Sequence, residues 1–367
     1  MAKLLLVTAH AQLTFTTNNN AITITGYNGA GGTVNIPRAI NGYPVTRIDS
    51  CEFSSSSGVS NVIISELVTN IAYGAFELYA YPYAPPPDVC LSAITVDTNN
   101  PVYCDVDGVL LDKRAGTLMQ YPCGKGGSQY TIPNWVANIG TNAFFYCTNL
   151  CDVIIPDNVT NLCAQAFEMC FGLTNATIGN GVLSIGANAF YGTSLTSVAL
   201  GSNVVTIGDN AFSGTGLGNI IIPASVGYLG LTVFQYCPHL AGVYFEGNAP
   251  ALDSSVNLFY GDGDVTVYYL PGTSGWKGSF GTVPIIPALP WNPRLQPSGA
   301  TLAGPSSPFG FIVTGSHNLS IVVESCTNLL NAAWQPVQSS IITTGSVSFN
   351  DPQWTNYASR FYRLRSP

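Results

Sequence analysis

The stretch LCDVIIPDNVTNLCAQAF, residues 150–167, contains one complete unit of the pattern that decides the fold. Its first part alternates inward and outward positions up to Pro156, which is typical of a short strand with one buried face. An aliphatic residue, Leu162, follows, and the unit closes on an Ala-Phe pair at Phe167. A unit this short cannot bury its own apolar side chains, so we expect neighbouring units to stack on one another.

The same unit recurs along the chain at a nearly constant period. Its phenylalanine returns at spacings of 23, 23, 22 and 22 residues, at Phe144, Phe167, Phe190, Phe212 and Phe234. An aliphatic residue precedes each phenylalanine by five positions, and the β-branched strand segments keep the same spacing. The period predicts a β-rich solenoid of short parallel strands with a continuous core. Residues 209–212 are expected to form a capped single helical turn, as are their equivalents in the other units.

Two insertions interrupt the period upstream. Ile71 with Phe76 repeats the unit, and Ile48 with Phe53 gives a weaker copy 23 residues earlier. The Pro-rich insertion at 78–90 is expected to form a polyproline loop on the rim.

The second insertion covers residues 99–123. Within it, residues 109–111 and 117–119 flank a short turn sequence, a pattern that predicts an antiparallel hairpin. Cys104 and Cys123 bracket this hairpin and are the better candidates for a disulfide. Cys147 and Cys170 occupy the same position in adjacent units, where we expect small buried residues rather than a bond.

These repeats resemble the BspA-type leucine-rich repeats of secreted and surface bacterial proteins. The resemblance is carried by AFxxCxxLxxVxIP, which begins at Ala143, and by the insertion motif NPxY, DGVL and YP between Asn100 and Pro122. It covers roughly residues 33–285. It implies a leucine-rich-repeat solenoid and, because members are often implicated in adhesion or protein binding, a function of that kind.

The period stops before the C-terminus. We place the solenoid at residues 12–285, a Pro-rich linker at 286–298 and a separate module at 299–367. The module reads as four strands with Trp334 and Trp354 as core anchors. Its ending, WTNY followed by RFYRL, resembles a small β-sandwich appended to many secreted proteins of environmental bacteria.

The first eleven residues contain a basic start, an apolar run and an Ala-His-Ala sequence. These are the three parts of a secretory signal, so we expect residues 1–11 to be a truncated signal segment and the mature chain to begin near Gln12. The run is short for a signal, and a buried first strand is the alternative. Export predicts an extracellular or cell-surface location, with which the low lysine content agrees.

Composition excludes several classes of function. Charged residues make up 8% of the chain and the net charge is −8, which disfavours nucleic-acid binding. No apolar run approaches the roughly 18 residues that a transmembrane helix needs. Three histidines without a C-x-x-C pair, and two Asp-Gly stretches without a closing Glu, predict neither a metal nor a cofactor. The scattered acids form no general acid–base pair, so we expect no enzyme.

The candidate binding face consists of the middle residue of each strand, which alternation turns outward. The series is Ile63, Thr95, Thr131, Ile154, Thr177, Ala199, Ile221 and Tyr244. It is uncharged and partly apolar, as contact surfaces often are, although β-branched residues also favour strands for their own sake.

The sequence therefore predicts an exported, non-enzymatic binding or adhesion protein whose partner is a protein or a cell-surface polymer. The alternative is a structural component that self-associates into a surface layer or fibre. A carbohydrate-processing accessory is a third class, suggested only by the tyrosine and tryptophan content.

Overall fold

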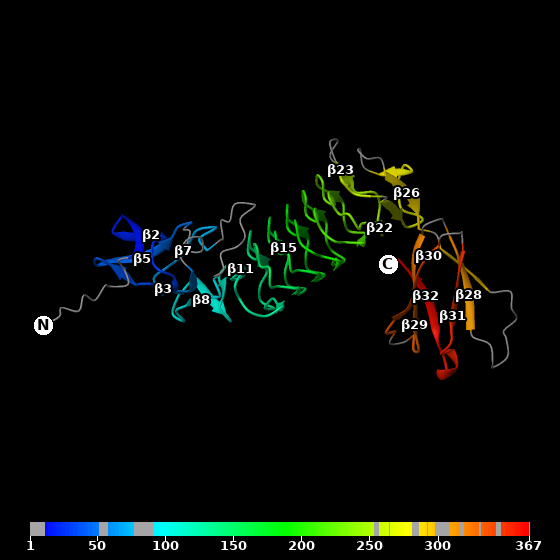
Figure 1. Cartoon of the computed structure of the whole chain (residues 1–367), viewed down its shortest axis with the longest axis horizontal. Coiled ribbons are helices and arrows are strands. Elements are labelled where there is room, and N and C mark those ends of the chain that lie inside the picture. Colours follow the sequence, from blue (N-terminus) through cyan, green and yellow to red (C-terminus); the bar gives the residue numbers. More distant parts are fainter. Residues whose placement is uncertain are drawn as a thin grey trace.

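The computed structural model is an elongated stack of coils followed by a strand-rich C-terminal module (Figure 1). It describes residues 12–50, 58–76, 91–252, 257–263, 265–280, 286–291, 293–297, 309–315, 319–329, 332–342 and 346–366. The expected signal segment, the Pro-rich insertion at 78–90 and Phe53 lie outside these residues. Strands and turns predominate in the described part, where η2 (Trp354–Asn356) is a short 3-10 helix.

The N-terminal coils contain β1 (Leu13–Asn18), β2 (Ala21–Tyr27), β3 (Gly32–Ile36), β4 (Ala39–Ile40), β5 (Tyr43–Ile48), β6 (Val59–Ile64), β7 (Asn70–Ile71) and β8 (Ala93–Val96). The insertion contains β9 (Tyr103–Val106), β10 (Val109–Asp112) and β11 (Thr117–Gln120). Strands β10 and β11 pair antiparallel, which confirms the predicted hairpin, and β9 pairs antiparallel with β10 on its other side.

The regular coils contribute strands to two sides of the stack. One side holds β12 (Gln129–Thr131), β14 (Asp152–Ile155), β16 (Asn175–Ile178), β18 (Ser197–Ala199), β20 (Asn219–Ile222), β22 (Gly242–Phe245) and β24 (Thr266–Tyr269). The other side holds β13 (Asn138–Ile139), β15 (Asn161–Leu162), β17 (Ser184–Ile185), β19 (Thr206–Ile207), β21 (Tyr228–Leu229) and β23 (Ala251–Leu252).

Strands of successive coils pair in parallel within the sheets of both sides. Ile154 lies opposite Thr177 on one side, and Leu162 lies opposite Ile185 on the other. The first side is divided into two sheets, one of which ends at β18 while the next begins at β20. The predicted solenoid of short parallel strands is confirmed.

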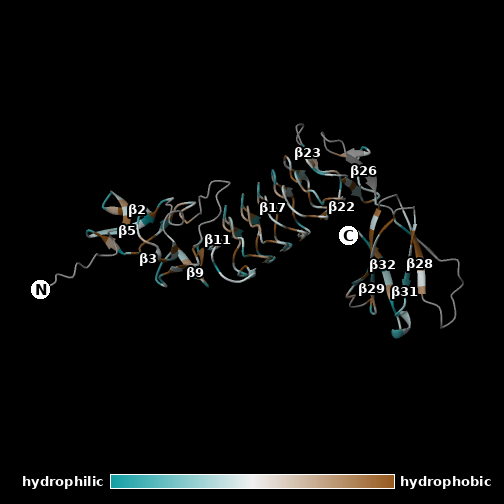
Figure 2. Cartoon of the chain, in the orientation of Figure 1, coloured by the Kyte–Doolittle hydropathy of each residue, from teal (hydrophilic) through white to brown (hydrophobic). Residues whose placement is uncertain are grey.

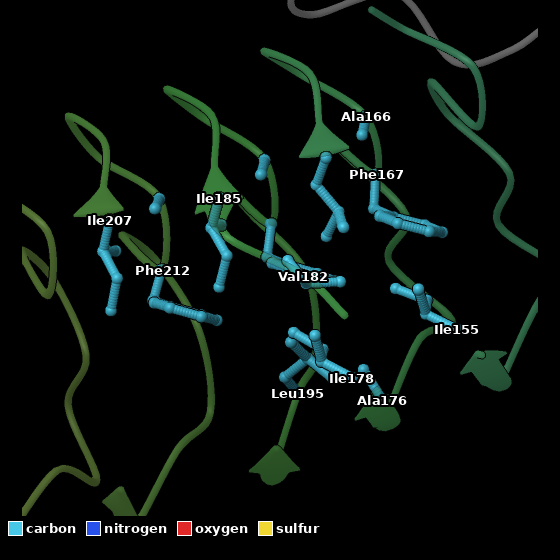
Figure 3. Packing of buried hydrophobic residues seen from close by; sticks show 14 of the residues in the cluster. Ile155, Ala166, Phe167, Ala176, Ile178, Val182, Ile185, Leu195, Ile207 and Phe212 are labelled. Carbon is cyan, nitrogen blue, oxygen red and sulfur yellow. The ribbon is translucent and has the colours of Figure 1, made fainter. Parts of the chain in front are cut away.

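The core is a ladder of phenylalanine rings that runs through the coils. Neighbouring rings lie 4.6–6.0 Å apart with interplanar angles of 2–19°, through Phe144, Phe167, Phe190, Phe212, Phe234 and Phe259. Tyr121 of the insertion stacks on Phe144 and extends the ladder by one rung. Inward residues of both sides, such as Ile155 and Ile185, pack around the rings (Figure 3). Figure 2 shows hydrophobic and hydrophilic residues alternating along the coils.

The segments expected as capped helical turns are instead turns with left-handed residues. The residue two positions before five of the six ladder phenylalanines has φ between 52° and 61°, at Asn142, Gln165, Asn188, Asn210 and Thr232. The N–H of Asn188 donates to the carbonyl of Asp209 in the next coil rather than within its own turn. Asparagine tolerates this conformation better than most residues, so the repeated Asn supplies a backbone bend and not a helix cap.

The C-terminal module is built from two antiparallel sheets. Its strands are β27 (Arg294–Pro297), β28 (Phe309–Thr314), β29 (Leu319–Cys326), β30 (Gln335–Ile342), β31 (Ser346–Asp351) and β32 (Phe361–Arg365). The sheets run in the orders β27-β28-β31 and β30-β29-β32, an arrangement compatible with a small sandwich. Its core contains Phe311 and Phe349, whereas Trp334 and Trp354 are only half-buried and do not anchor it.

Most of the described residues in the segment expected as a stiff linker are paired in sheets. Strand β26 (Ile286–Pro290) pairs in parallel with β24 and antiparallel with β25 (Ser279–Phe280), so it extends the solenoid. Strand β27 pairs antiparallel with β28 and lies at the edge of its sheet, where proline is tolerated. Between them, the Trp291 Nε1–H donates to the carbonyl of Ser320 at 3.2 Å. Within the described residues, the solenoid and the module are thus in contact at Trp291 and Ser320.

Candidate functional site

Four of the predicted face residues form one continuous exposed stripe on neighbouring strands. Thr131, Ile154, Thr177 and Ala199 are exposed and lie opposite one another in β12, β14, β16 and β18. Half of the surface of Ile154 is open to solvent, although the side chain is large and apolar. Their strand neighbours, such as Val153 and Ile155, are buried, so alternation places the stripe on the outer face as predicted. We call these four residues the sheet stripe.

The remaining four predicted residues lie elsewhere. Ile63 and Thr95 are exposed and paired with each other, but they belong to the separate sheet β3-β6-β8. The insertion hairpin separates this sheet from β12, because its strands join the other side of the stack. Ile221 is half-buried, and Tyr244 is only 3% exposed. Tyr244 therefore does not present an open surface, contrary to the prediction.

The C-terminal module covers Tyr244. The tyrosine stacks on Tyr268 of the next coil with ring centroids 4.8 Å apart, and both rings pack into the apolar cluster of the module with Phe311 and Val313. Burial raises the pKa of Tyr244 to about 12, with Ser320 of the module offsetting part of the effect. One end of the predicted face is thus occupied by the chain's own C-terminal region.

A pocket of about 290 Å³ lies at this junction. Phe245 and Trp291 line it from the solenoid side, and Arg363 and Arg365 line it from β32. Both arginines bind the carboxylate of Glu324 at 2.7 Å. Burial opposes ionisation of Glu324, but the hydrogen bonds from Arg365 and Arg363 outweigh it and lower its pKa. Both arginines are therefore engaged in ion pairs within the module.

A ladder of polar side chains flanks the sheet stripe, and a similar ladder lies on the other side of the stack. Asn175 donates to Asp152 at 2.9 Å in one coil and accepts from Ser197 at 3.0 Å in the next. On the other side of the stack, Asn161 donates to Asn138 at 2.9 Å and accepts from Ser184 at 3.1 Å. The repeated hydrogen bonds hold the coils in register and satisfy the side chains, so the flanks of the stripe are polar with little charge.

The solenoid surface lacks positive charge over a long stretch. No lysine or arginine occurs between Lys125 and Lys277, while acidic residues are scattered through the same stretch. A partner that carries phosphate, sulfate or carboxylate groups would be repelled there. The stripe and its surroundings suit a neutral or basic partner.

A second surface feature lies on the turns and was missed by the sequence interpretation. Phe171, Tyr236 and Tyr260 are large aromatic residues, and each is 48–54% exposed. Tyr236 and Tyr260 form one edge-to-face pair, and Tyr146 with Phe171 forms another, both with ring centroids 5.6 Å apart. The available signal was a tyrosine two residues after a ladder phenylalanine, as in FFY at 144–146 and FQY at 234–236.

The groups considered for chemistry have structural partners. Asp105 accepts a hydrogen bond from the N–H of Val96 at 2.8 Å, and Asp107 with Gly108 forms the left-handed turn between β9 and β10. Within the described part of the chain, no cluster of three or more His, Cys, Asp or Glu residues could hold a metal ion. Cys104 and Cys170 are free thiols, so neither of the two cysteine pairs considered from the sequence is bonded.

Asp262 is a carboxylate whose pKa is raised by its surroundings. Burial raises its pKa to about 6, although Oδ1 accepts the backbone N–H of Cys237. As the pH rises from about 4 to about 6, the unfolded chain ionises this group while the folded chain resists, so its contribution to stability falls across that window and stays low at neutral pH.

We therefore expect Asp262→Asn to raise the melting temperature at neutral pH and to change it little near pH 4, where the group is largely uncharged in the folded chain. The amide oxygen still accepts the Cys237 N–H. Melting curves across the window measure the difference. Asp157→Asn makes the same change at an exposed turn and serves as control. A lower melting temperature for Asp262→Asn at neutral pH would contradict the prediction.

No helix in the described residues is long and apolar enough to cross a membrane.

The chain resembles several proteins of known structure. The chain is similar to a leucine rich cell surface protein from Faecalibacterium prausnitzii, with 28% identity over 66% of this chain and 55% of that one and a TM-score of 0.38. It is also similar to a leucine-rich repeat protein from Bacteroides ovatus (21% identity, 70% of each chain, TM-score 0.47) and to the pneumococcal vaccine antigen PcpA (15% identity, 71% of this chain and 92% of that one, TM-score 0.40).

The chain spans just over half the length of the F. prausnitzii protein. No curated protein is detectably similar in sequence. The family model for the BspA type leucine rich repeat region matches residues 13–80 and 124–241 in six copies. These ranges contain most of the coils described above and make up more than half of the chain, which therefore belongs to the BspA-type leucine-rich repeat family.

Proposed function

We propose that this is an exported, non-enzymatic binding or adhesion protein that contacts a protein or cell-surface polymer through the sheet stripe. The proposal rests on the continuous row of exposed residues Thr131, Ile154, Thr177 and Ala199. We further propose that the protein acts outside the cell or at its surface, with residues 1–11 as the signal segment. We propose a solenoid over 12–285 and a module over 299–367, with the connecting residues 286–298 contributing β26 to the solenoid and β27 to a sheet of the module.

Three properties of the sheet stripe support the proposal: its strands are evenly spaced, its side chains are uncharged, and a packed core lies behind it. Four strands spaced about 4.8 Å apart give a row about 14 Å long between the outer strands. The buried side chains behind the stripe and the polar ladders beside it hold each outward residue in place, so little side-chain freedom is lost on binding. Because Tyr244 is covered by the C-terminal module, the proposed contact ends before that coil.

The test introduces charge without disturbing the core. In Thr177→Glu with Ala199→Lys, both residues are exposed, so we expect the free energy of unfolding to change by no more than about 0.5 kcal/mol. Binding should nevertheless be lost, because burying these charges in an uncharged contact requires desolvation. Thermal melting and retention on immobilised protein and polymer fractions of the native habitat measure the two effects.

The matched control is Leu183→Glu with Val205→Lys. These residues are 47% and 46% exposed, lie in neighbouring coils on the other side of the stack, and receive the same two charges. The control variant should bind as the wild type does. Equal retention of the stripe variant and the wild type, with loss in the control, would place the contact on the other side.

Self-assembly is the second candidate. Among the residues that the structure describes, β1 is the outermost strand of its sheet and pairs with β2 alone, and an edge of this kind can pair with another chain. Light scattering over a range of concentrations separates the two functions: a binding protein keeps a constant mass, whereas a structural component grows with concentration.

A further inference from the structure

One residue of each coil forms a continuous row along the turns, which we call the turn ridge. These residues follow the ladder phenylalanines by two positions: Tyr146, Met169, Gly192, Gly214, Tyr236 and Gly261. Every one of them has a φ between 55° and 80°. Backbone hydrogen bonds join successive coils here, as in the N–H of Gly192 to the carbonyl of Ser213. The stack thus imposes the left-handed region that favours glycine on the whole row.

Two tyrosines occupy this row although glycine would suit the backbone better. A side chain in this region is strained, and strain of this kind persists only where something compensates it. For Tyr236 the compensation is not burial, because 54% of the residue is exposed. Strained, exposed residues of this sort gather at sites that contact ligands.

The ring of Tyr236 is held in a defined position. A Cβ on Gly261 in the next coil would lie 2.3 Å from its Cδ1, so the absence of that atom makes room for the ring. Tyr260 packs against it at 75°. The aromatic surface is therefore open to solvent and fixed in orientation before any ligand arrives.

A similar aromatic cluster lies at the other end of the turn ridge. Tyr146 packs edge to face against Phe171, which is 48% exposed. Two of the coils between the two clusters carry glycines, and a Cβ on Gly214 would meet only Gly192. With coils about 4.8 Å apart, Tyr146 and Tyr236 are separated by about 19 Å. Between them lie the two glycines and Met169, whose Sδ would be 3.1 Å from a Cβ on Gly192.

We propose that the turn ridge binds a neutral polysaccharide. Sugar rings have flat C–H faces that pack on aromatic rings, and their hydroxyls bond to peptide groups and to side chains such as Ser194, whose hydroxyl donates to the Phe171 carbonyl. Two aromatic clusters separated by Met169 and two glycines suit an extended chain that spans several sugar units. The stretch from Lys125 to Lys277 has no internal lysine or arginine, so an anionic polymer is excluded as the ligand.

The test uses the full chain and soluble neutral polysaccharides, namely mixed-linkage β-glucan, galactomannan, hydroxyethylcellulose and starch, in affinity electrophoresis. Pull-down on microcrystalline cellulose and chitin adds the insoluble forms. We expect at least one of them to retain the wild type. Tyr236→Gly should weaken that binding about tenfold, the scale of one lost aromatic contact. The same variant should keep or raise the melting temperature, because glycine relieves the strain.

Phe171→Ser tests the second cluster without a change at a strained position, and it decides the outcome if Tyr236→Gly folds poorly. Leu183→Ser, which removes an equally exposed apolar residue from another side, should bind normally. Thr177→Glu with Ala199→Lys should also bind normally, which separates this site from the sheet stripe. The proposal is overturned if no probe retains the wild type, if alginate or heparin retains it better, if polyproline binds in place of the glycans, or if Leu183→Ser weakens binding equally.

Discussion

Replacing Phe190 with alanine should destabilise the solenoid by about 3–5 kcal/mol, which is the usual cost of truncating a buried phenylalanine. The ring has no exposed surface and lies between Phe167 and Phe212, with centroids 5.1 and 5.4 Å away and planes within 4° of parallel. Its removal leaves a gap in the ladder that the neighbouring rings cannot close, because the coil spacing is set by backbone hydrogen bonds.

The loss should be local, because each coil contacts only its neighbours. Hydrogen exchange is expected to accelerate in residues 160–220 and to change less in the N-terminal coils, whose core is a separate cluster. Val205→Ala, which truncates a half-exposed residue in the same region, should have little effect. Unchanged exchange in 160–220 for Phe190→Ala would contradict the ladder.

The second large effect is expected at Asn100, where the insertion begins. Its side chain is fully buried and makes four hydrogen bonds to backbone groups. The amide nitrogen donates to the carbonyls of Ser65 and Val68 at 3.0 and 2.8 Å, and the oxygen accepts from the N–H groups of Val102 and Tyr103 at 2.9 and 2.8 Å. One residue thus joins the insertion to the preceding coil.

Asn100→Ala leaves these four backbone groups buried without partners. Each such group costs about 1–3 kcal/mol, so we expect a loss on the order of 4 kcal/mol with partial relief from water. Asn100→Asp should be equally harmful, because an ionised carboxylate cannot donate to the two carbonyls. The adjacent Asn99 bonds at the surface to Asp97, and Asn99→Ala is the control. Chemical denaturation measures all three, and similar values for Asn99→Ala and Asn100→Ala would refute the role assigned to Asn100.

Much of the solenoid could be predicted because its information is local and periodic. A residue that recurs every 22 or 23 positions must occupy equivalent places in successive coils, so the spacing of Phe144 to Phe234 predicted the aromatic ladder. Alternation within three letters predicted that Thr131, Ile154, Thr177 and Ala199 face outward. Both conclusions need only the neighbouring residues and the period.

The backbone conformation of the turns could not be predicted from the local sequence. An Asp-Asn pair before an Ala-Phe pair is a common helix-capping sequence, and propensity alone favours that interpretation at Asn210. In the stack, the backbone N–H of Asn210 bonds to the carbonyl of Leu231 in the next coil, which a helical turn would prevent. Hydrogen bonds between coils outweigh the local preference, and they also create the left-handed row on which Tyr146 and Tyr236 lie.

By itself, the sequence determined the repeat family, the register of the coils and the composition of the core, because each follows from periodic burial of apolar side chains. Only the tertiary structure decided which outward residues remain accessible. Tyr244 occupies an outward position by alternation, yet Phe311 and Val313, which lie more than sixty residues away, cover it. Tyr236 and Tyr260 come together on the surface only because successive coils stack. The solvent exposure of a side chain depends on contacts between distant parts of the chain, which a local sequence pattern does not indicate.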